Sequence, residues 1–446
     1  MVGNYGGTRK FSMLIVMKPP VSDEEVRPGN PIPPASSASA KKLPTANCLV
    51  GARRVAASTS LLALLLGMLG AGSLACRRRP PPPQPYVAFV VNNQSATLAA
   101  VNLEDFRLIA SLPVTPRPER VIVRPRSRQL YVLSATGKIN VVAYPHPQVI
   151  ATIDVGRSSR DLQFSPDGRS AYVLDRVDRD VVFLDCEAAA GIPVPPPLGQ
   201  PPREIPKVIF RLHLSDTPSG LALTPDGKTL IVALPALNRL SFLSTQTRQA
   251  LGEVEVGKTP GPMVVLPDNS KVFVADTGEE KISVAEVATR RLLSHIEIST
   301  RPTALIVKPD GGEIFVLNAQ ATSLVIVDAF HDNVEQIFPT GREPAAAVFR
   351  RDSSIFYLAN AGDGSVMAME VETRAVVAST HIGVEPRALA LTPDERFLVV
   401  ADSGTSSIAV LYAEPTHMSN DRSMLVTTVQ VGTQPVDVAV PDWLEK

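Results

Sequence analysis

The chain is poor in cysteine and tryptophan and carries no net charge. Its 446 residues include 3 cysteines, too few for a disulfide framework, so at most one bridge could support the fold. The 44 basic residues are balanced by 44 acidic ones, and the positive excess with which proteins bind nucleic acid is therefore missing. The composition predicts a globular protein that does not bind nucleic acid.

A repeat is the strongest pattern that the sequence does contain. Its units are spaced by 42 residues and open at Pro260, Pro302, Pro344 and Pro386. Each proline is followed by a short apolar segment, a turn such as residues 309–311 (Pro-Asp-Gly), and a second apolar segment that ends in Asp or Asn. Two more short strands complete the unit. Four strands at a period of about 40–45 residues are typical of a β-propeller.

The number of unit openings predicts eight blades. The segment after Tyr86 begins at a second strand, and the missing first strand is found at residues 432–442. We therefore expect an all-β propeller of four-stranded blades in which the C-terminal strand pairs with the three N-terminal ones, because closure removes two exposed sheet edges. Val436, Val438 and Val440 are expected to face one side of that strand. The openings are Pro118, Ser159, Pro218, Pro260, Pro302, Pro344, Pro386 and Pro435.

The N-terminal part of the chain precedes the repeats and has another composition. Residues 1–52, rich in Pro, Ser and Ala, are predicted to be a disordered leader or to precede the true start. Residues 53–75 join a basic flank to an apolar core shorter than the about 20 residues of a membrane-spanning helix, as in a secretory signal peptide. Residues 76–85 form a basic, proline-rich tether, and residues 86–446 form the propeller.

The end of the signal peptide resembles a bacterial lipobox. The residues Ser73-Leu74-Ala75-Cys76 match it except at Ser73, where an aliphatic residue is usual. The resemblance implies that Cys76 becomes the lipidated first residue. It also implies an exported lipoprotein anchored at the cell envelope, on the outer membrane or in the periplasm. The alternative is ordinary cleavage near Ala75, which leaves Cys76 free.

The second strands and the turns before them resemble the YVTN-repeat family of β-propellers. The strand ends read Tyr-Val-Leu-Ser at 131–134, Tyr-Val-Leu-Asp at 172–175 and Phe-Val-Leu-Asn at 315–318, and turns read Ser-Pro-Asp-Gly at 165–168 and Thr-Pro-Asp-Gly at 224–227. The resemblance covers residues 86–446 and implies an exported or surface-associated propeller. The family usually has seven blades, so seven is the alternative to our count of eight. Related propellers include lactonases and quinoprotein or haem d1 electron-transfer domains.

Polar residues are expected to gather on one face of the ring. In an antiparallel blade, the loops between strands 2 and 3 share a face with the connections to the next blade; we call it the mouth face. The turns between strands 1 and 2 and the loops between strands 3 and 4 lie on the other, the turn face, with the long segments 187–207 and 414–424. The mouth face is either a solvated rim or a binding surface, and the second strands should end in caps for their own loops. Its candidate residues are Arg160, Lys258, Arg301, Arg342, Arg387, Asp175, Asp276 and Asp402.

A second candidate site lies where the first strands line the central channel. Two residues after the opening most units have a small residue, such as Gly220 or Ala388, but three consecutive blades have Asp437, Arg120 and Asp161. An arginine between two carboxylates predicts either a structural ion pair or a site that binds an anion.

The residue pattern gives little support for catalysis. The 6 histidines occupy no common repeat position, and no Gly-x-Ser-x-Gly elbow is present, so we predict no catalytic residue, metal or cofactor. Two function classes remain. The first is a monomeric, exported and tethered binding or scaffold propeller with an envelope protein or glycan as its partner. The second is an enzyme of the lactonase type with a site at the mouth.

Overall fold

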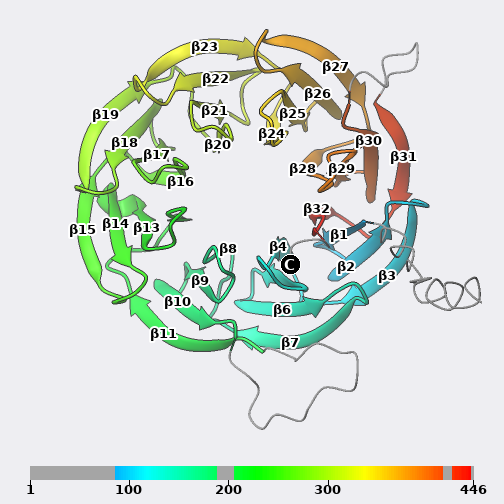
Figure 1. Cartoon of the computed structure of the whole chain (residues 1–446), viewed down its shortest axis with the longest axis horizontal. Helices are drawn as coiled ribbons and strands as arrows, with labels where there is room; N and C mark the ends of the chain where they lie inside the picture. The colour runs from blue at the N-terminus through cyan, green and yellow to red at the C-terminus, as the bar shows by residue number, and fades with distance from the viewer. Residues whose placement is uncertain (1–85, 188–204, 415–423, 443–446) are drawn as a thin grey trace, which may run out of the picture. The chain divides into compact units, whose positions relative to one another are not determined.

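The computed structural model describes residues 86–187, 205–414 and 424–442, which form a closed ring of eight four-stranded antiparallel sheets (Figure 1). The fold is therefore an all-β propeller, and the count of eight blades is confirmed. Seven blades are continuous in sequence: β4–β7, β8–β11, β12–β15, β16–β19, β20–β23, β24–β27 and β28–β31. The eighth, in the order β3-β2-β1-β32, joins the two ends of the propeller. We call it the composite blade.

Each blade contributes one strand to each of four concentric positions. The innermost strands are β4 (Pro118–Val123), β8 (Asp161–Phe164), β12 (Gly220–Leu223), β16 (Pro260–Val265), β20 (Ala304–Val307), β24 (Pro344–Phe349), β28 (Pro386–Leu391) and β32 (Pro435–Ala439). The second strands are β1 (Val87–Asn92), β5 (Gln129–Ser134), β9 (Ser170–Asp175), β13 (Thr229–Leu234), β17 (Lys271–Asp276), β21 (Glu313–Leu317), β25 (Ile355–Asn360) and β29 (Phe397–Asp402). The third strands are β2 (Thr97–Asn102), β6 (Lys138–Ala143), β10 (Asp180–Asp185), β14 (Arg239–Ser244), β18 (Lys281–Glu286), β22 (Ser323–Asp328), β26 (Ser365–Glu370) and β30 (Ser407–Tyr412). The outer strands are β3 (Arg107–Pro113), β7 (Gln148–Asp154), β11 (Lys207–His213), β15 (Ala250–Glu255), β19 (Arg291–Glu297), β23 (Asn333–Pro339), β27 (Ala375–His381) and β31 (Leu425–Gln430).

Ring closure takes place through β32, which pairs with β1 as the sequence predicts. The register places Phe89 opposite Ala439 and shifts by one residue between Val91 and Asn92. Because of this bulge, Val436 packs toward the β4–β7 blade whereas Val438 packs toward the β28–β31 blade. The expectation that all three valines of the closing strand face one side is therefore wrong.

The core lies between neighbouring blades, because each sheet is covered on one face by the preceding blade and on the other face by the next one. The second strands are accordingly almost fully apolar, and every residue of β25 is buried. Between the β20–β23 and β24–β27 blades, Phe315, Phe349 and Phe356 pack with ring centroids 4.6–4.9 Å apart. Burial of one such side chain is worth roughly 1.5–3 kcal/mol, so this repeated packing supplies most of the driving force for the ring.

The outer strands form the edge of each blade at the circumference of the ring. All eight third-to-fourth strand pairs contain a register shift, for example between Ala100 and Val101 or between Val284 and Ala285. A bulge bends and twists an edge strand, which hinders pairing with another chain.

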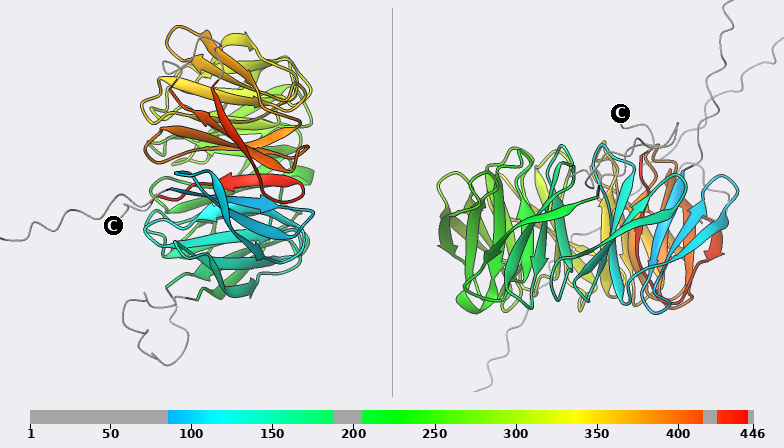
Figure 2. Two further views of the ribbon diagram at one scale, coloured as in Figure 1. Left: turned by 90° about the vertical axis from the view of Figure 1, so that its right-hand side faces the viewer. Right: turned by 90° about the horizontal axis from the view of Figure 1, so that it is seen from below.

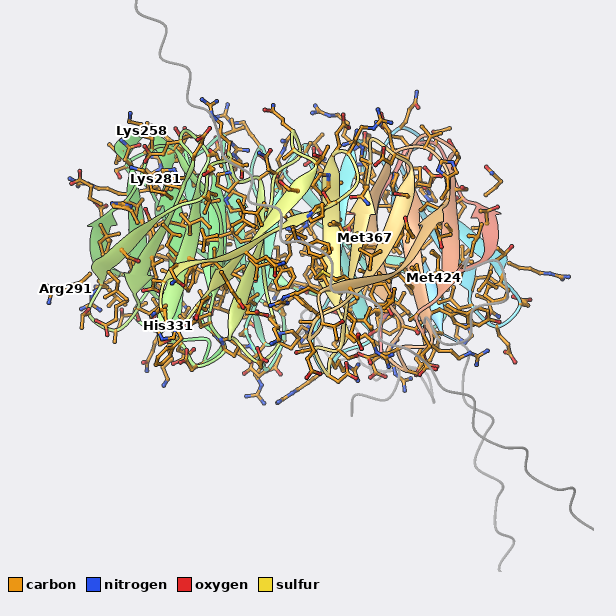
Figure 3. The ribbon with its side chains drawn as sticks, turned by 90° about the horizontal axis from the view of Figure 1, so that it is seen from above. Lys258, Lys281, Arg291, His331, Met367 and Met424 are labelled. Carbon is orange, nitrogen blue, oxygen red and sulfur yellow. The ribbon has the colours of Figure 1, made fainter. Side chains whose placement is uncertain are left out.

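Hydrogen bonds confirm the predicted division into two faces. At the mouth face, the loop after β17 binds the connection before β16, with Gly278 N donating to Lys258 O over 3.1 Å. At the turn face, Val287 N donates to Ser270 O over 2.9 Å, which joins a 3–4 loop to a 1–2 turn. Strands run from one face to the other (Figure 2), and Lys258 and His331 mark opposite faces in Figure 3.

The predictions for the leader fall on residues that are not described. Residues 1–85, with the predicted signal peptide, Cys76 and tether, lie outside the described part, as do 188–204 and 415–423 within the two long segments. Both segments connect a third to a fourth strand, β10 to β11 and β30 to β31, as predicted. Among the described residues, none belongs to a helix with the length and apolarity to cross a membrane.

Candidate functional site

In five of the eight connections of the mouth face, a glycine lies against the residue that ends the second strand of the next blade, a contact that we call the glycine lock. In the β8–β11 blade, a Cβ on Gly156 would lie 1.8 Å from Oδ2 of Asp175, and Gly156 has a φ of +133°. The same oxygen accepts a hydrogen bond from Arg157 N over 2.9 Å, while Oδ1 accepts from Val177 N and Asp178 N. Asp175 therefore caps its own loop, as predicted, and it also fixes the incoming connection through Arg157 N, a contact that was not predicted.

The lock recurs around the ring with small variations. Asp402 accepts hydrogen bonds from Val384 N over 2.9 Å and from the hydroxyl of Thr405 over 2.6 Å. Burial raises the pKa of Asp402. In the composite blade, the side-chain amide of Asn92 occupies the position that the carboxyl of Asp175 or Asp402 holds in the other blades. The other pairs in contact are Gly257 with Asp276, Gly341 with Asn360, Gly383 with Asp402 and Gly432 with Asn92.

Asp276 differs from Asp175 and Asp402, the other carboxylates of the lock, because one of its oxygens has no partner among the described residues. Oδ2 accepts the hydroxyl of Ser283 over 2.7 Å, and Ser283 in turn lies 2.9 Å from Nδ1 of His295. Oδ1 is buried without a hydrogen bond among the described residues. Burial raises the pKa of Asp276 to about 7, although the Ser283 hydroxyl acts in the opposite direction. This carboxyl therefore titrates near neutral pH.

Ion pairs hold two arginines of the rim in place, the predicted Arg342 and, in addition, Arg157. Arg157 lies 2.5 Å from Asp178, and Arg342 lies 2.6 Å from Asp363, at equivalent positions of the β8–β11 and β24–β27 blades. Hydrogen bonds from the two guanidinium groups lower the pKa of Asp178 and of Asp363. Both pairs are well exposed, so they orient side chains more than they stabilise the fold.

The remaining predicted bases of the rim divide into two groups. Arg160 pairs with Glu119 of the neighbouring blade and Arg387 with Glu385, both at 3.1 Å. Lys258, Arg301 and the additional rim residue Arg117 form no ion pair with any other described residue, and the guanidinium groups of both arginines are exposed. These three charges remain available to a ligand.

The three channel residues are brought together, but not as a symmetric cluster. Arg120 Nη1 lies 3.1 Å from Asp161 Oδ1, and no second contact completes a bidentate pair. Asp437 instead accepts the backbone N–H of Val121 over 2.9 Å through Oδ2. The carboxyl thereby joins the closing strand β32 to the innermost strand of the next blade.

Charge in the channel is controlled by burial. Burial raises the pKa of Asp437 to about 6, against the effect of the Val121 N–H and of Arg120. It also raises the pKa of Asp161, although the Arg120 charge opposes this. Because the carboxylates already have partners, the arrangement favours the structural interpretation of this cluster over an anion site.

A hollow of about 660 Å³ at the mouth was not predicted from the sequence. It lies where the composite blade meets the β28–β31 and β4–β7 blades, and we call it the seam pocket. Its volume is within the about 300–1,000 Å³ of small-molecule sites. Four separate chain segments form it, so no sequence motif marks it. Its lining residues are Asn93, Gln94, Ala96, Pro116, Arg117, Ser403, Gly404, Ser406 and Gln434.

Metal-ligating side chains do not gather in the described part of the chain. No group of three or more His, Cys, Asp or Glu residues there has the arrangement of a metal site. His213 and His331 each pair with an aspartate, Asp180 and Asp328, on separate blades. Cys186 is fully buried after β10 and behaves as a small apolar side chain.

Comparison with known proteins finds the same fold in other proteins but does not identify the function. No protein-family model matches the chain, and no curated protein sequence matches it. Solved structures do resemble it. The dihydro-heme d1 dehydrogenase NirN in complex with DHE superposes with a TM-score of 0.65 at 15% identity, covering 81% of this chain and 76% of NirN.

Two further structures are similar over most of their length. Apo AztD from Citrobacter koseri has a TM-score of 0.60 at 13% identity, covering 80% of this chain and 98% of AztD. A functionally unknown protein from Desulfotomaculum acetoxidans has a TM-score of 0.54 at 16% identity, covering 71% of this chain and all of that one. At these identities the likeness concerns the propeller fold alone.

Proposed function

We propose that this chain is an exported, lipid-anchored propeller of the YVTN-repeat type that binds an envelope protein or glycan at its mouth face without catalysing a reaction. The observation that supports this most is the fixed geometry of the rim. Glycine locks hold the connections, and ion pairs such as Arg157–Asp178 and Arg342–Asp363 hold the projecting side chains. A surface whose loops are already ordered loses little conformational entropy when it binds.

The unpaired bases make this surface selective for partners with negative charge. Lys258 and Arg301 project from connections of the mouth face and have no ion-pair partner among the described residues. Charges at the rim of an interface steer association and discriminate between partners, while exposed pairs already satisfied within the protein contribute little. Binding should therefore weaken as the salt concentration rises.

The proposed anchor places the mouth away from the membrane. Tyr86, the first described residue, lies at the turn face, where its carbonyl accepts Leu103 N over 2.9 Å. A tether that ends there holds the turn face toward the membrane to which a lipid on Cys76 would attach it. About ten extended tether residues reach roughly 30 Å, which permits tilt.

The anchor is tested with Cys76→Ala. Loss of the thiol removes the only atom to which the lipid can be attached at this position, so fatty-acid labelling should disappear and the protein should move from membrane to soluble fractions. Labelling that persists in Cys76→Ala contradicts the anchor and leaves the binding proposal untouched.

The binding proposal is tested by co-purification from solubilised envelope with the full chain as bait. Lys258→Glu combined with Arg301→Glu should reduce recovery of the partner at least about tenfold, because like charges then face it. The control combines Lys228→Glu and Arg291→Glu, which change the same charge near the turn face and should leave recovery unchanged. Equal recovery with both variants, or turnover of a lactone panel by the purified chain, would overturn the proposal.

A further inference from the structure

The seam pocket is lined almost entirely by uncharged residues. Loops at 176–179, 277–280 and 361–364 contain acidic or basic residues, whereas the two loops that line the pocket, 93–96 and 403–406, contain none, as is also true of loops 235–238 and 319–322. The two loops of the pocket offer hydroxyl and amide groups instead. The only charge in the lining is that of Arg117.

Several of the polar groups in the pocket are free to bind a ligand. Asn93 and Ser403 are engaged, because their side chains donate to the carbonyls of Pro118 and Pro435. The side chains of Gln94, Ser406 and Gln434 form no hydrogen bond within the described residues. Together with Arg117, four unengaged polar side chains border one hollow.

The frame that holds these side chains is rigid. Ala96, Arg117, Ser406 and Gln434 all have a positive φ, between 51° and 58°. Each of their carbonyls accepts a backbone hydrogen bond of 2.9–3.2 Å from another segment, such as Ala135 N to Arg117 O. The left-handed backbone is therefore fixed, and the pocket is formed before any ligand arrives.

We propose that the seam pocket binds a carboxylated saccharide, with the Arg117 guanidinium on the carboxylate and the neighbouring amides and hydroxyl on the sugar hydroxyls. This proposal deepens the proposed function, on which it rests, by naming the ligand class at one place on the mouth face. One guanidinium matches one planar carboxylate, whereas a phosphate dianion usually recruits several donors or a second base. Apolar lining is limited to Ala96 and Pro116, which disfavours an apolar peptide side chain.

The test is calorimetric titration of the full chain with D-galacturonate, trigalacturonate and galacturonate methyl ester. The acid should bind, and the ester, which keeps the sugar ring and its hydroxyls but lacks the charge, should bind about tenfold more weakly or not at all. Tighter binding of the trimer than of the monomer identifies a polysaccharide as the source of the sugar acid. Equal affinity for both identifies a free sugar acid.

Matched variants connect binding to this pocket. Arg117→Gln should weaken binding of the acid about tenfold or more, whereas Arg291→Gln, which removes an arginine near the turn face, should not. Equal losses from both variants, equal affinity for acid and ester, or no binding of the acid would overturn the inference. If the acid fails to bind while the envelope partner is still recovered through Lys258 and Arg301, the inference fails and the proposed function stands.

Discussion

The composite blade and the β24–β27 blade have the same four strands and the same glycine lock, but they depend on different parts of the chain. All strands of β24–β27 come from residues 344–381, whereas the composite blade combines 87–113 with 435–439. Its closing strand is held by pairing with β1, by Asn93 N donating to Gln434 O over 2.9 Å, and by Ser403 donating to Pro435 O. Local sequence is enough to build a continuous blade, but the ring closes only through contacts between its ends.

The largest effect is expected from deletion of residues 432–446, which removes β32 from the composite blade. Full burial of an aliphatic side chain is worth roughly 1.5–3 kcal/mol, and the deletion also exposes two strand edges. Since a domain is typically stable by only about 5–15 kcal/mol, we expect aggregation or loss of cooperative melting. Scanning calorimetry and size exclusion measure both. Deletion of 443–446 alone is the control, and a monomeric 432–446 deletion with unchanged Tm would contradict ring closure by β32.

The glycine lock gives a second comparison between continuous and composite blades. Gly156→Ala should lower the free energy of unfolding by at least about 2 kcal/mol, because its φ of +133° and the nearby Asp175 both exclude a Cβ. Gly432→Ala should cost less, since Gly432 has no left-handed φ and its Cβ would lie 2.7 Å from Asn92 Cγ. Urea unfolding measures both values. The reverse order would mean that the composite blade relies on its lock more than a continuous blade does.

A smaller effect on stability is expected from the titration of Asp276, whose carboxyl lies against Gly257 in the glycine lock. The folded pKa of Asp276, about 7, is above the unfolded value, so the folded state binds the proton more tightly. Stability should therefore fall as the pH rises from about 4 to about 7 and level off above that. Asp276→Asn should abolish this slope and raise the free energy of unfolding at pH 8 by about 1–3 kcal/mol.

The reverse substitution, of an amide by a carboxyl at the same lock position of the composite blade, provides a second test of this pH dependence. Asn92, whose amide donates to the Thr97 hydroxyl over 3.1 Å, holds the equivalent position. Asn92→Asp should introduce a fall in stability with rising pH that the natural blade lacks. Urea unfolding at pH 5 and pH 8 measures the slope for each variant. A slope that persists in Asp276→Asn would assign the titration to another group.

The smallest effect is expected at the channel. The folded pKa of Asp437, about 6, is also raised, so its contribution to stability is lost as the pH rises from about 4 to about 6. Asp437→Asn keeps an oxygen for Val121 N–H and should gain about 1 kcal/mol above pH 6. Asp161→Asn, in a continuous blade, should change stability by less than about 1 kcal/mol, because the Arg120 side chain with which it pairs is 48% exposed. A loss of stability in Asp437→Asn at pH 8 would mean that the carboxylate charge itself holds the seam.

The repeat made most of the fold predictable from the sequence. The 42-residue spacing of Pro260, Pro302, Pro344 and Pro386 fixed the strand order, and the partial unit at Pro435 fixed closure. The two faces followed from antiparallel geometry. The orientation of Val436 did not, because a single bulge in β32 reverses the side on which a strand residue lies and leaves no mark in the pattern of apolar residues.

The site was less accessible to sequence reasoning because its contacts join different blades. That Asp437 binds Val121 depends on how two innermost strands are placed side by side, at a separation of 316 residues in the chain. The lock glycines were visible as a repeated residue, but their contact with the next blade was not. The seam pocket is assembled from neutral residues such as Gln94 and Ser406, which carry no signature of their own.

Because the composite blade combines strands from both ends of the propeller, its sheet can be completed only late in synthesis. The first three strands of the propeller emerge at the start of synthesis and the strand that completes their sheet emerges last. Until residue 439 has been added, β1 has one open edge, whatever the state of the seven blades in between. An interrupted chain therefore keeps an edge that chaperones and proteases can recognise. Ring closure therefore requires that every strand of the propeller has been synthesised.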